Sequence, residues 1–434
     1  MLPVLLGAWL GLGAGTAGAM VGGPICNVPA DYPTIQLAVS VPLCTTVEVA
    51  PGTYKEHVVI GHTLTLKGAQ AGVDARARSG PESIITNSEG PVQVLADNVV
   101  VNGFTIEGAT SDPTTDPAAL GAGIWTNPSF YGGHGGTQIL DNIIQNNIAG
   151  VYLNNGTNPA KVQFNLFKNN NAPGAGEGNG IDSEFLSNAL IDNNTFSGDT
   201  STSVLVLDQP GDEKITVSNN ELVGGSSERV FFANVKNSSI VGNTSIGSTS
   251  SATVRLAGGD SNVAVNGNVL ANGVRGIRVD NPFEIGPNSG VTAHQNCIEN
   301  NSLAGLEEDT PEGYSPVAPG SLEATNNWWG SSTGPTIASN PGGTGDKIID
   351  QEGVVGYKPW LTSQPPAPCP IVFTKLASGS FVIGDKNATV GSNVTFSEVE
   401  WWGSNWWKEN SLSGGQAPSA FKGFAESSPS PPTC

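Results

Sequence analysis

The chain has 434 residues and a formal net charge of −20, with 18 Lys and Arg against 38 Asp and Glu. This charge argues against nucleic acid or an anionic membrane as a partner, because both require a basic surface. Charged residues make up only 13% of the chain, which contains 57 Gly, 30 Pro and 40 Asn. A sequence so short of helix formers and so rich in turn formers excludes a helical bundle and disfavours an α/β enzyme with long amphipathic helices.

Residues 1–19 form an apolar stretch of small side chains that ends in Ala17-Gly18-Ala19, an A-x-A cleavage pattern. No Lys or Arg precedes Lys55, so the positively charged start of a signal peptide is missing. We interpret 1–19 as an incomplete secretory signal. The alternative is an uncleaved membrane anchor, since about 20 apolar residues can span a bilayer. We expect a secreted or cell-surface protein without membrane insertion of the mature chain.

The cysteines are consistent with export. Cys26 and Cys44 bracket a short segment and are expected to form a disulfide in an oxidising compartment. The sequence leaves the pairing of Cys297, Cys369 and Cys434 open. The chain has no C-x-x-C pair, so zinc and thioredoxin chemistry have no support.

The first regular element is predicted as a helix over residues 31–39. Asp31 is a candidate N-cap, and Ile35, Ala38 and Val39 recur at helical spacing. Short strands separated by Gly, Pro or Asn follow up to Leu95. If these strands open a stacked β architecture, an amphipathic helix at this position would cover its open apolar end.

A repeat then dominates the chain, with the pattern apolar-x-x-Asn-x-apolar. It occurs nine times, and its asparagines are Asn102, Asn142, Asn165, Asn194, Asn220, Asn243, Asn268, Asn296 and Asn327. The first gap is 40 residues and the later gaps are 23–31 residues. Repeats of this length without helix signals predict a parallel β-solenoid, whose coils bury their apolar faces against each other. We expect Asn at the bends because it tolerates positive φ, and stacked Asn side chains can form a hydrogen-bonded ladder.

The composition changes after Leu361. Residues 363–370 are interpreted as a Pro-rich linker, and residues 371–434 as a small β module that is incomplete at its C-terminal end. Trp401, Trp402, Trp406 and Trp407 gather in this module. They are either the core of the module or a platform on which sugars stack.

Several of these segments resemble secreted bacterial proteins of the pectate-lyase-like superfamily, with repeats of the carbohydrate-binding and sugar-hydrolase type. The resemblance rests on Asp31–Ala38, Ala50–Gly68 and the Asn repeats, and Asn326–Pro335 followed by Tyr357–Leu361 resembles a closing coil. It covers residues 26–362. It implies an all-β fold, a right-handed parallel β-helix with an N-terminal capping helix. It implies a fold rather than an activity, because these motifs build coils.

The strands that open each coil predict a row of aligned, outward side chains. The row contains Trp125, Tyr152, Asp182, Leu205, Phe231, Arg255, Arg278 and Glu307. A second row, two positions further on, contains Asn154, Glu184 and Asp280, with Asp208 nearby. In the superfamily that the chain resembles, this sheet usually lines the substrate groove. We therefore expect contact with an extended polysaccharide or a cell-surface glycan along this face.

The binding and catalytic roles follow from residue type. Trp125 and Tyr152 are expected to stack on sugar rings. Arg255 and Arg278 are candidates to hold uronate carboxylates, or to act as the base of a β-elimination.

Carboxylates complete the candidate site. Asp182, Glu184 and Asp280 are candidates for substrate contact, for acid and base roles, or for Ca²⁺ binding. The alternative is an ordinary solvated β-face on which the two arginines pair with Asp280. The acidic run Glu307–Asp309 with Glu312 is a second Ca²⁺ candidate, or a solvated loop.

The familiar catalytic signatures are absent. The chain contains no H-E-x-x-H, G-x-S-x-G or Walker motif. Enzymatic activity therefore stays open. The alternatives are a glycan-binding surface protein, a polysaccharide lyase or glycoside hydrolase acting on an acidic glycan, and a purely structural or adhesive stalk.

Overall fold

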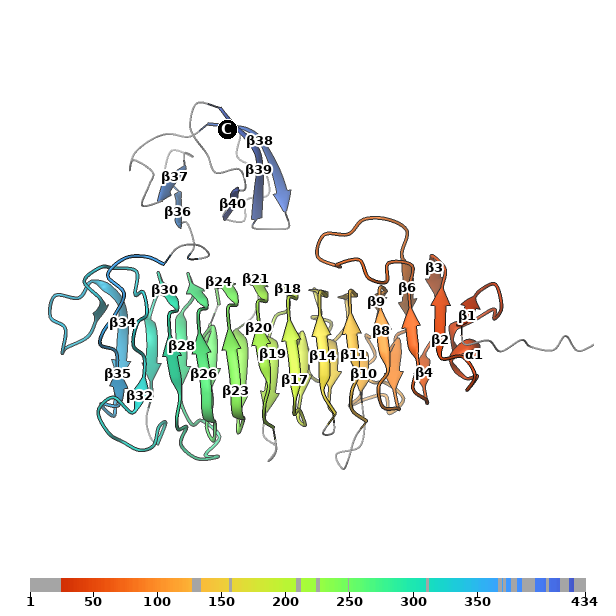
Figure 1. Cartoon of the computed structure of the whole chain (residues 1–434), viewed down its shortest axis with the longest axis horizontal. Coiled ribbons are helices and arrows are strands. Elements are labelled where there is room, and N and C mark those ends of the chain that lie inside the picture. The colour runs from red at the N-terminus through yellow and green to blue at the C-terminus, as the bar shows by residue number, and fades with distance from the viewer. Residues whose placement is uncertain are drawn as a thin grey trace, which may run out of the picture.

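Three long parallel sheets wind around one apolar core (Figure 1). The computed structural model describes residues 25–126, 134–155, 158–207, 212–223, 227–248, 250–309, 312–365 and 369, together with five strands after residue 371. Each successive coil adds strands to the sheets in turn. The predicted all-β solenoid is confirmed, and the fold is a right-handed parallel β-helix. The interpretation of 1–19 as a signal lies outside the described residues.

Sheet A has 13 strands and sheet B has ten. The strands of sheet A are β1 (Ile25–Val28), β2 (Thr46–Val49), β5 (Thr65–Lys67), β8 (Val100–Asn102), β11 (Gln138–Leu140), β14 (Ala160–Gln163), β17 (Ala189–Asp192), β20 (Thr216–Ser218), β23 (Lys236–Val241), β26 (Ser261–Asn266), β29 (Thr292–His294), β32 (Leu322–Glu323) and β35 (Val355–Gly356). The strands of sheet B are β3 (Gly52–Tyr54), β6 (Ser83–Thr86), β9 (Thr105–Glu107), β12 (Ile143–Gln145), β15 (Leu166–Lys168), β18 (Thr195–Ser197), β21 (Glu221–Val223), β24 (Thr244–Ile246), β27 (Val269–Ala271) and β30 (Cys297–Glu299).

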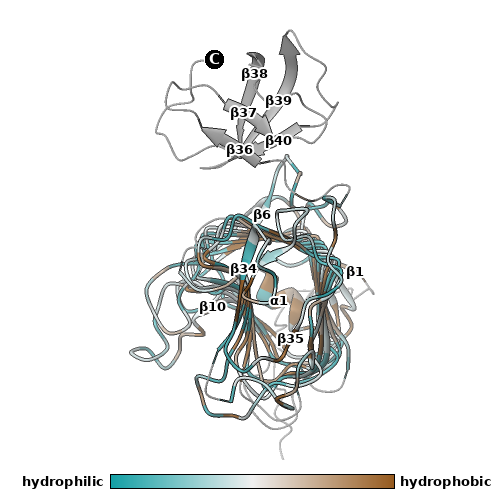
Figure 2. Ribbon diagram, turned by 90° about the vertical axis from the view of Figure 1, so that its left-hand side faces the viewer, coloured by the Kyte–Doolittle hydropathy of each residue, from teal (hydrophilic) through white to brown (hydrophobic). Residues whose placement is uncertain are grey.

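Sheet C has 12 strands and opposes sheet A across the core (Figure 2). Its strands are β4 (Val58–Ile60), β7 (Val92–Val94), β10 (Ala122–Thr126), β13 (Ala149–Leu153), β16 (Ile181–Ser183), β19 (Thr202–Leu207), β22 (Glu228–Ala233), β25 (Val254–Leu256), β28 (Arg275–Val279), β31 (Ala304–Glu308), β33 (Pro335–Thr336) and β34 (Gly345–Asp350). After residue 371, β36 (Val372–Lys375) pairs antiparallel with β37 (Phe381–Gly384). There, β38 (Thr395–Trp402), β39 (Trp406–Ser413) and β40 (Phe421–Phe424) form a second antiparallel sheet.

Alternation along each strand puts apolar side chains into the core and the intervening side chains outside. In β13, for example, Val151 and Leu153 are fully buried whereas Tyr152 between them is half-buried. Phe167 and Phe196 stack in successive coils with ring centroids 4.4 Å apart. Each coil thus covers the apolar face of the next, as the repeat predicted.

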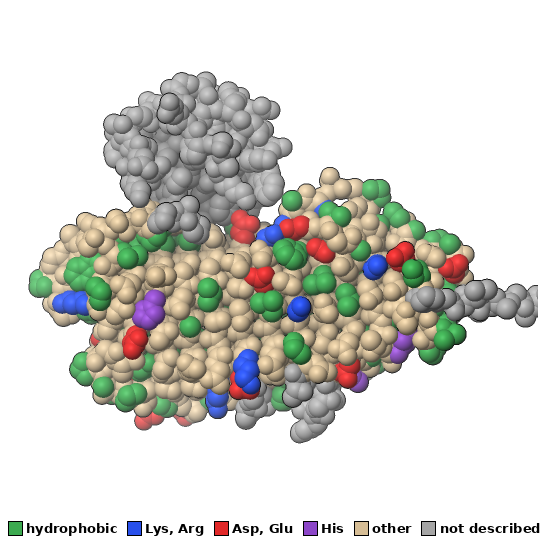
Figure 3. Space-filling view, in the orientation of Figure 1, with side chains coloured by type: hydrophobic (Ala, Val, Ile, Leu, Met, Phe, Trp, Pro, Cys, Tyr) green, Lys and Arg blue, Asp and Glu red, His purple; other side chains and the backbone are tan. Residues whose placement is uncertain are grey.

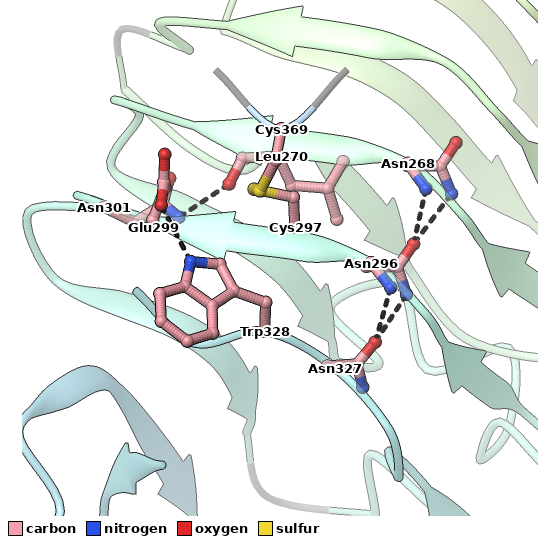
Figure 4. Close-up of a disulfide and its surroundings, with 9 residues drawn as sticks. All are labelled: Asn268, Leu270, Asn296, Cys297, Glu299, Asn301, Asn327, Trp328 and Cys369. Atoms are coloured by element: carbon pink, nitrogen blue, oxygen red, sulfur yellow. Dashed lines mark hydrogen bonds between the residues drawn. A yellow bond between two sulfur atoms is a disulfide. The ribbon is translucent and has the colours of Figure 1, made fainter. Parts of the chain in front are cut away.

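The expected asparagine ladder forms at the bend between sheets A and B. Except in the last member, each side-chain Nδ2 donates to the Oδ1 of the next Asn at 2.9–3.2 Å and to a strand carbonyl of the preceding coil. Its members are Asn142, Asn165, Asn194, Asn220, Asn243, Asn268, Asn296 and Asn327. Figure 4 shows its last three members.

Two details of the ladder prediction were wrong. Asn102 is not a member, because it aligns with Leu140 in the register, and Phe104 occupies the ladder position of that coil. The ladder asparagines also lack positive φ, which falls on the residue before each of them, for example Asp141 or Asn193. Asn is therefore used at this bend for its side-chain hydrogen bonds rather than for its backbone freedom.

A short helix, α1 (Ile35–Val39), caps the N-terminal end of the core, within the outline of the coils in Figure 2. The predicted start at Asp31 was wrong. Thr34 is the N-cap, and its side chain accepts a hydrogen bond from the Leu37 N–H. Asp31 instead accepts from the backbone and side chain of Asn27, which closes a turn. The buried face of Ile35, Ala38 and Val39 is as predicted.

Two disulfides join the described segments. Cys26 and Cys44 form the expected bond beside the capping helix. Cys297 on β30 bonds Cys369, 72 residues later, so the end of the predicted linker is attached to the last strand of sheet B (Figure 4). Cys434 lies outside the described residues.

Candidate functional site

The outward side chains of sheet C stack in the predicted register. Each residue of the row pairs with the next across neighbouring strands, without a slip or a bulge. We call this set the outward row: Trp125, Tyr152, Asp182, Leu205, Phe231, Arg255, Arg278 and Glu307. Seven steps of about 4.8 Å give the row a length of about 34 Å. A single face of the solenoid therefore carries aromatic, acidic, apolar and basic groups in sequence.

The aromatic end of the row consists of Trp125 and Tyr152, both half-buried. The Tyr152 hydroxyl donates to the carbonyl of Ala175 at 2.9 Å, which fixes the ring on the sheet. Burial, followed by the negative charges of Asp182 and Glu184, raises the pKa of Tyr152. Tyr152 is therefore a neutral hydrogen-bonding aromatic group.

Asp182 lies directly beside Tyr152 in the row. Its Oδ2 accepts from the Asn179 side chain at 2.8 Å. Burial is the main cause that raises the pKa of Asp182 to about 6, and the charge of Glu184 adds to it. A carboxyl group in such a position holds its proton into the mildly acidic range and can act as a proton donor.

The middle of the row is apolar. Phe231 and Leu205 pack with Leu207 and Ile285 on the outside of the sheet. Phe283 contacts Phe231 edge-to-face at 6.2 Å and is 59% exposed. This patch separates the acidic group around Asp182 from the arginines.

The arginines of the row are held in ion pairs. Arg255 binds Asp280 at 2.8 Å and Glu228 at 3.2 Å, and its guanidinium lies 5.5 Å from the centre of the Phe231 ring. Burial acts to lower the pKa of Arg255, but the carboxylates of Asp280 and Glu228 outweigh it and raise that pKa. Arg255 is therefore a permanent cation that already has its partners.

Arg278 has three carboxylate partners. It binds Asp309 at 2.7 Å, Asp280 at 3.1 Å and Glu307 at 3.4 Å. Arg275 also pairs with Glu307. The pairing of the two row arginines with Asp280, which the sequence offered as the alternative, is present.

The residues of the predicted second row, Asn154, Glu184 and Asp280, do not form one site. The Asn154 side chain accepts from the backbone of Glu184 and Phe185, and so organises the turn after β16. Asp280 is 4% exposed and serves the arginines. Asp208 lies outside the described residues.

The structure adds residues that sequence reasoning missed. Glu228 and Arg275 begin their strands, outside the alternating positions of the row, and Phe283 lies in a turn after β28. Asp309, which the sequence offered only as part of a Ca²⁺ candidate, instead binds Arg278. The available signal in the sequence was the presence of oppositely charged residues on strands of neighbouring coils. Which of them contact each other depends on how the coils stack. Cys297, Glu299 and Cys369 are close enough to share a metal ion, although the two sulfur atoms form the disulfide.

The surface over sheet A carries no comparable row in Figure 3, which shows isolated charged and hydrophobic side chains among other side chains and backbone. An open depression of about 850 Å³ lies at the first coils, lined by residues such as Asn27, Glu48 and Lys67, away from the row. No described helix is long and apolar enough to cross a membrane.

The comparison with protein families supports this architecture. A family model described as "Right handed beta helix region" matches residues 175–310. No curated protein sequence matches significantly. Similar solved structures include the Dettilon tailspike protein, at 16% identity and a TM-score of 0.49, which covers 75% of this chain and 68% of that chain.

Two further solved structures are similar to this chain. The pectin methylesterase from Aspergillus niger is 13% identical with a TM-score of 0.41, covering 66% of this chain and 91% of that chain. PfbA, a surface adhesin of Streptococcus pneumoniae, is 13% identical with a TM-score of 0.39, covering 69% of this chain and 92% of that chain. The continuous parallel sheets and the matching family model lead to one conclusion: the chain is a right-handed parallel β-helix protein.

Proposed function

We propose that this protein is secreted or displayed at a cell surface and binds an extended glycan along the outward row of sheet C. The unbroken register from Trp125 to Glu307 is the observation that supports the proposal. A linear polymer can contact such a row over several successive coils. Trp125 would stack on one sugar ring, and the exposed Phe283 would offer a second apolar contact.

The charges of the row favour a neutral or cationic glycan over an acidic one. The guanidinium groups of Arg255, Arg275 and Arg278 are outnumbered by the carboxylates that they bind. These carboxylates belong to Glu228, Asp280, Glu307 and Asp309. Asp182 and Glu184 add further negative charge at the other end of the row. A polyuronate would have to displace these internal partners, and it would meet repulsion from the remaining carboxylates.

A binding assay tests the proposal. The full chain is run through gels that contain neutral, cationic or anionic polysaccharides, and retardation is measured. We expect retardation by a neutral or cationic polymer, and Trp125→Ala should weaken affinity about ten-fold, which corresponds to about 1.4 kcal/mol. Phe164→Ala is the matched control, because Phe164 is an exposed aromatic residue at the bend between sheets A and B. Absence of retardation by every polymer, or equal losses in both variants, would contradict the proposal.

A second candidate function is glycoside hydrolysis at the same face. It rests on Asp182, whose raised pKa suits a general acid, with Glu184 two positions further on as the second carboxylate. Asp182→Asn should abolish the release of reducing ends from a bound polymer while binding remains. If the wild-type chain releases none, hydrolysis is excluded for the polymers tested.

A lyase mechanism with an arginine base is not part of the proposal. A base must be deprotonated to accept a proton, and the carboxylates around Arg255 raise its pKa and keep it charged.

A further inference from the structure

Two carboxylates at the C-terminal end of sheet C each keep one buried oxygen without a hydrogen-bond partner among the described residues. They are Glu308, the last residue of β31, and Glu352, in the turn after β34. Glu308 is completely buried, and its Oε2 accepts from the backbone N–H groups of Gln351 and Glu352 at 3.0 and 2.9 Å. The remaining oxygens are Glu308 Oε1 and Glu352 Oε2.

A third oxygen lies close to Glu308 Oε1. A Cβ atom placed on Gly313 would come within 3.1 Å of Glu308 Oε1 and within 2.2 Å of the carbonyl oxygen of Asp309. Both oxygens therefore approach the same side of the Gly313 backbone, so closely that a side chain at this position would collide with the Asp309 carbonyl. Oxygen atoms are the ligands that hard cations prefer.

The charges around this place are negative and unbalanced. Burial raises the pKa of Glu308 to about 7, and the charges of Glu352 and Asp350 add to that effect. None of the ion pairs in the described part of the chain includes Glu308 or Glu352. Arg275 and Arg278 lie on β28, the strand paired with β31, and are bound to other carboxylates, including Glu307 and Asp309. A buried carboxylate without a counter-charge is costly, so the arrangement calls for a cation or a proton.

We propose that Ca²⁺ binds here, with Glu308 Oε1, Glu352 Oε2 and the Asp309 carbonyl as protein ligands and water in the remaining positions. Ca²⁺ suits the site better than Mg²⁺, because Ca²⁺ accepts irregular sets of carboxylate and carbonyl oxygens. Bound there, it attaches the turn after β34 to the end of β31. This site does not depend on the proposed glycan function.

The ligand set differs from the acidic run expected from sequence. The carboxylates of Glu307 and Asp309 are taken by arginines, and the Asp309 side chain also accepts from Gln351 at 2.7 Å. Glu308, by contrast, has a buried carboxylate oxygen without a hydrogen bond or ion pair among the described residues. Its partner Glu352 comes from a turn 44 residues later in the chain.

The test compares thermal unfolding and calorimetric Ca²⁺ titration of the full chain after treatment with a chelator. Wild-type protein should bind one Ca²⁺ at this site with a dissociation constant at or below about 1 mM. Its Tm should rise by about 2 °C or more when Ca²⁺ is in large excess. Glu308→Gln should lose both effects, and Glu352→Gln should weaken binding at least about ten-fold.

Glu299→Gln is the matched control. Glu299 lies on the neighbouring strand β30, is also buried and also has one unpartnered oxygen, but its other oxygen accepts from Trp328 at 3.0 Å (Figure 4). This variant should keep the Ca²⁺ response of the wild type. If Glu308→Gln does not fold, Glu352→Gln decides, because Glu352 is only partly buried. A Ca²⁺ titration of Glu352→Gln equal to that of the wild type, or no effect of Ca²⁺ on the wild type, would overturn the proposal. Protonation of Glu308 would then be what balances the buried carboxylates.

Discussion

Replacing Asn220 by Ala in the middle of the ladder gives the sharpest test of what holds the coils together. The Asn220 side chain donates to Asn243 Oδ1 and to the Ile191 carbonyl, both at 2.9 Å. Its Oδ1 accepts from the backbone N–H and the side chain of Asn194, at 2.9 and 3.0 Å. All four hydrogen bonds are buried, so no bulk solvent can replace them.

The magnitude follows from the groups left behind. Alanine removes all four hydrogen bonds and leaves the Asn194 N–H and the Ile191 carbonyl short of a partner, together with one hydrogen of the Asn194 amide. At about 1–3 kcal/mol for each unsatisfied buried group, with two or three groups affected, the free energy of unfolding should fall by about 3–6 kcal/mol. Asn171→Ala should cost less than about 1 kcal/mol, because Asn171 is exposed and makes one side-chain bond, to the Gly198 carbonyl at 3.2 Å.

Equilibrium unfolding in urea measures the difference, and amide hydrogen exchange locates it. Exchange should accelerate most in β17, β20 and the bends beside Asn220, since neighbouring coils stabilise one another. A loss in Asn220→Ala no larger than that in Asn171→Ala would refute the reasoning. In that case apolar stacking alone would hold the coils, and the ladder would only fill space.

Three further changes test other parts of the structure. Asp280→Ala should lower the free energy of unfolding by about 3–5 kcal/mol, because it leaves Arg255 and Arg278 without a shared buried carboxylate; a urea titration showing less than about 1 kcal/mol would contradict this. Burial raises the pKa of Asp212 to about 7, so the folded state binds a proton that the unfolded state releases above about pH 4. The contribution of Asp212 to the free energy of unfolding is therefore complete below about pH 4 and is lost as the pH rises to about 7. Asp212→Asn should flatten the decline of Tm between pH 4 and 8. A Tm profile equal to that of the wild type would contradict this prediction. The Cys26→Ser, Cys44→Ser double variant opens a bond that spans 18 residues and should cost about 3 kcal/mol in the same urea assay; equal stability would show that the cap is held by packing alone.

The course of the three sheets and the register of the outward row could be predicted from sequence. A slip of one residue would turn every core side chain of a strand outward, so the alternation of apolar residues specifies the pairing. For this reason the row from Trp125 to Glu307 matches the structure at each step. The same logic exposes the error at Asn102. Its local pattern fits the repeat, but its register places it beside Leu140, and the unusual 40-residue gap to Asn142 was the available warning.

Side-chain partners across coils were beyond sequence reasoning because they depend on stacking rather than on spacing. Glu228 reaches Arg255 over 27 residues and Asp309 reaches Arg278 over 31. Neither sequence separation follows from a fixed repeat length, since the turns between strands vary in length. The bond between Cys297 and Cys369 shows the same limit, since it joins a regular coil to a linker without a repeat of its own.

This limit bears directly on the choice of ligand. In the sequence, Arg255 and Arg278 stand at matching positions of adjacent coils, as a pair of guanidinium groups that could clamp uronates. In the structure, Asp280 lies between them and binds both, while Glu228, Glu307 and Asp309 take their remaining faces. Opening that network for a glycan carboxylate would exchange one anion for another and leave a buried carboxylate unpaired, so little affinity would be gained. Trp125 and Phe283 take no part in this network, and the remaining charges of the row are negative, which is why a neutral or cationic glycan is the better-supported partner.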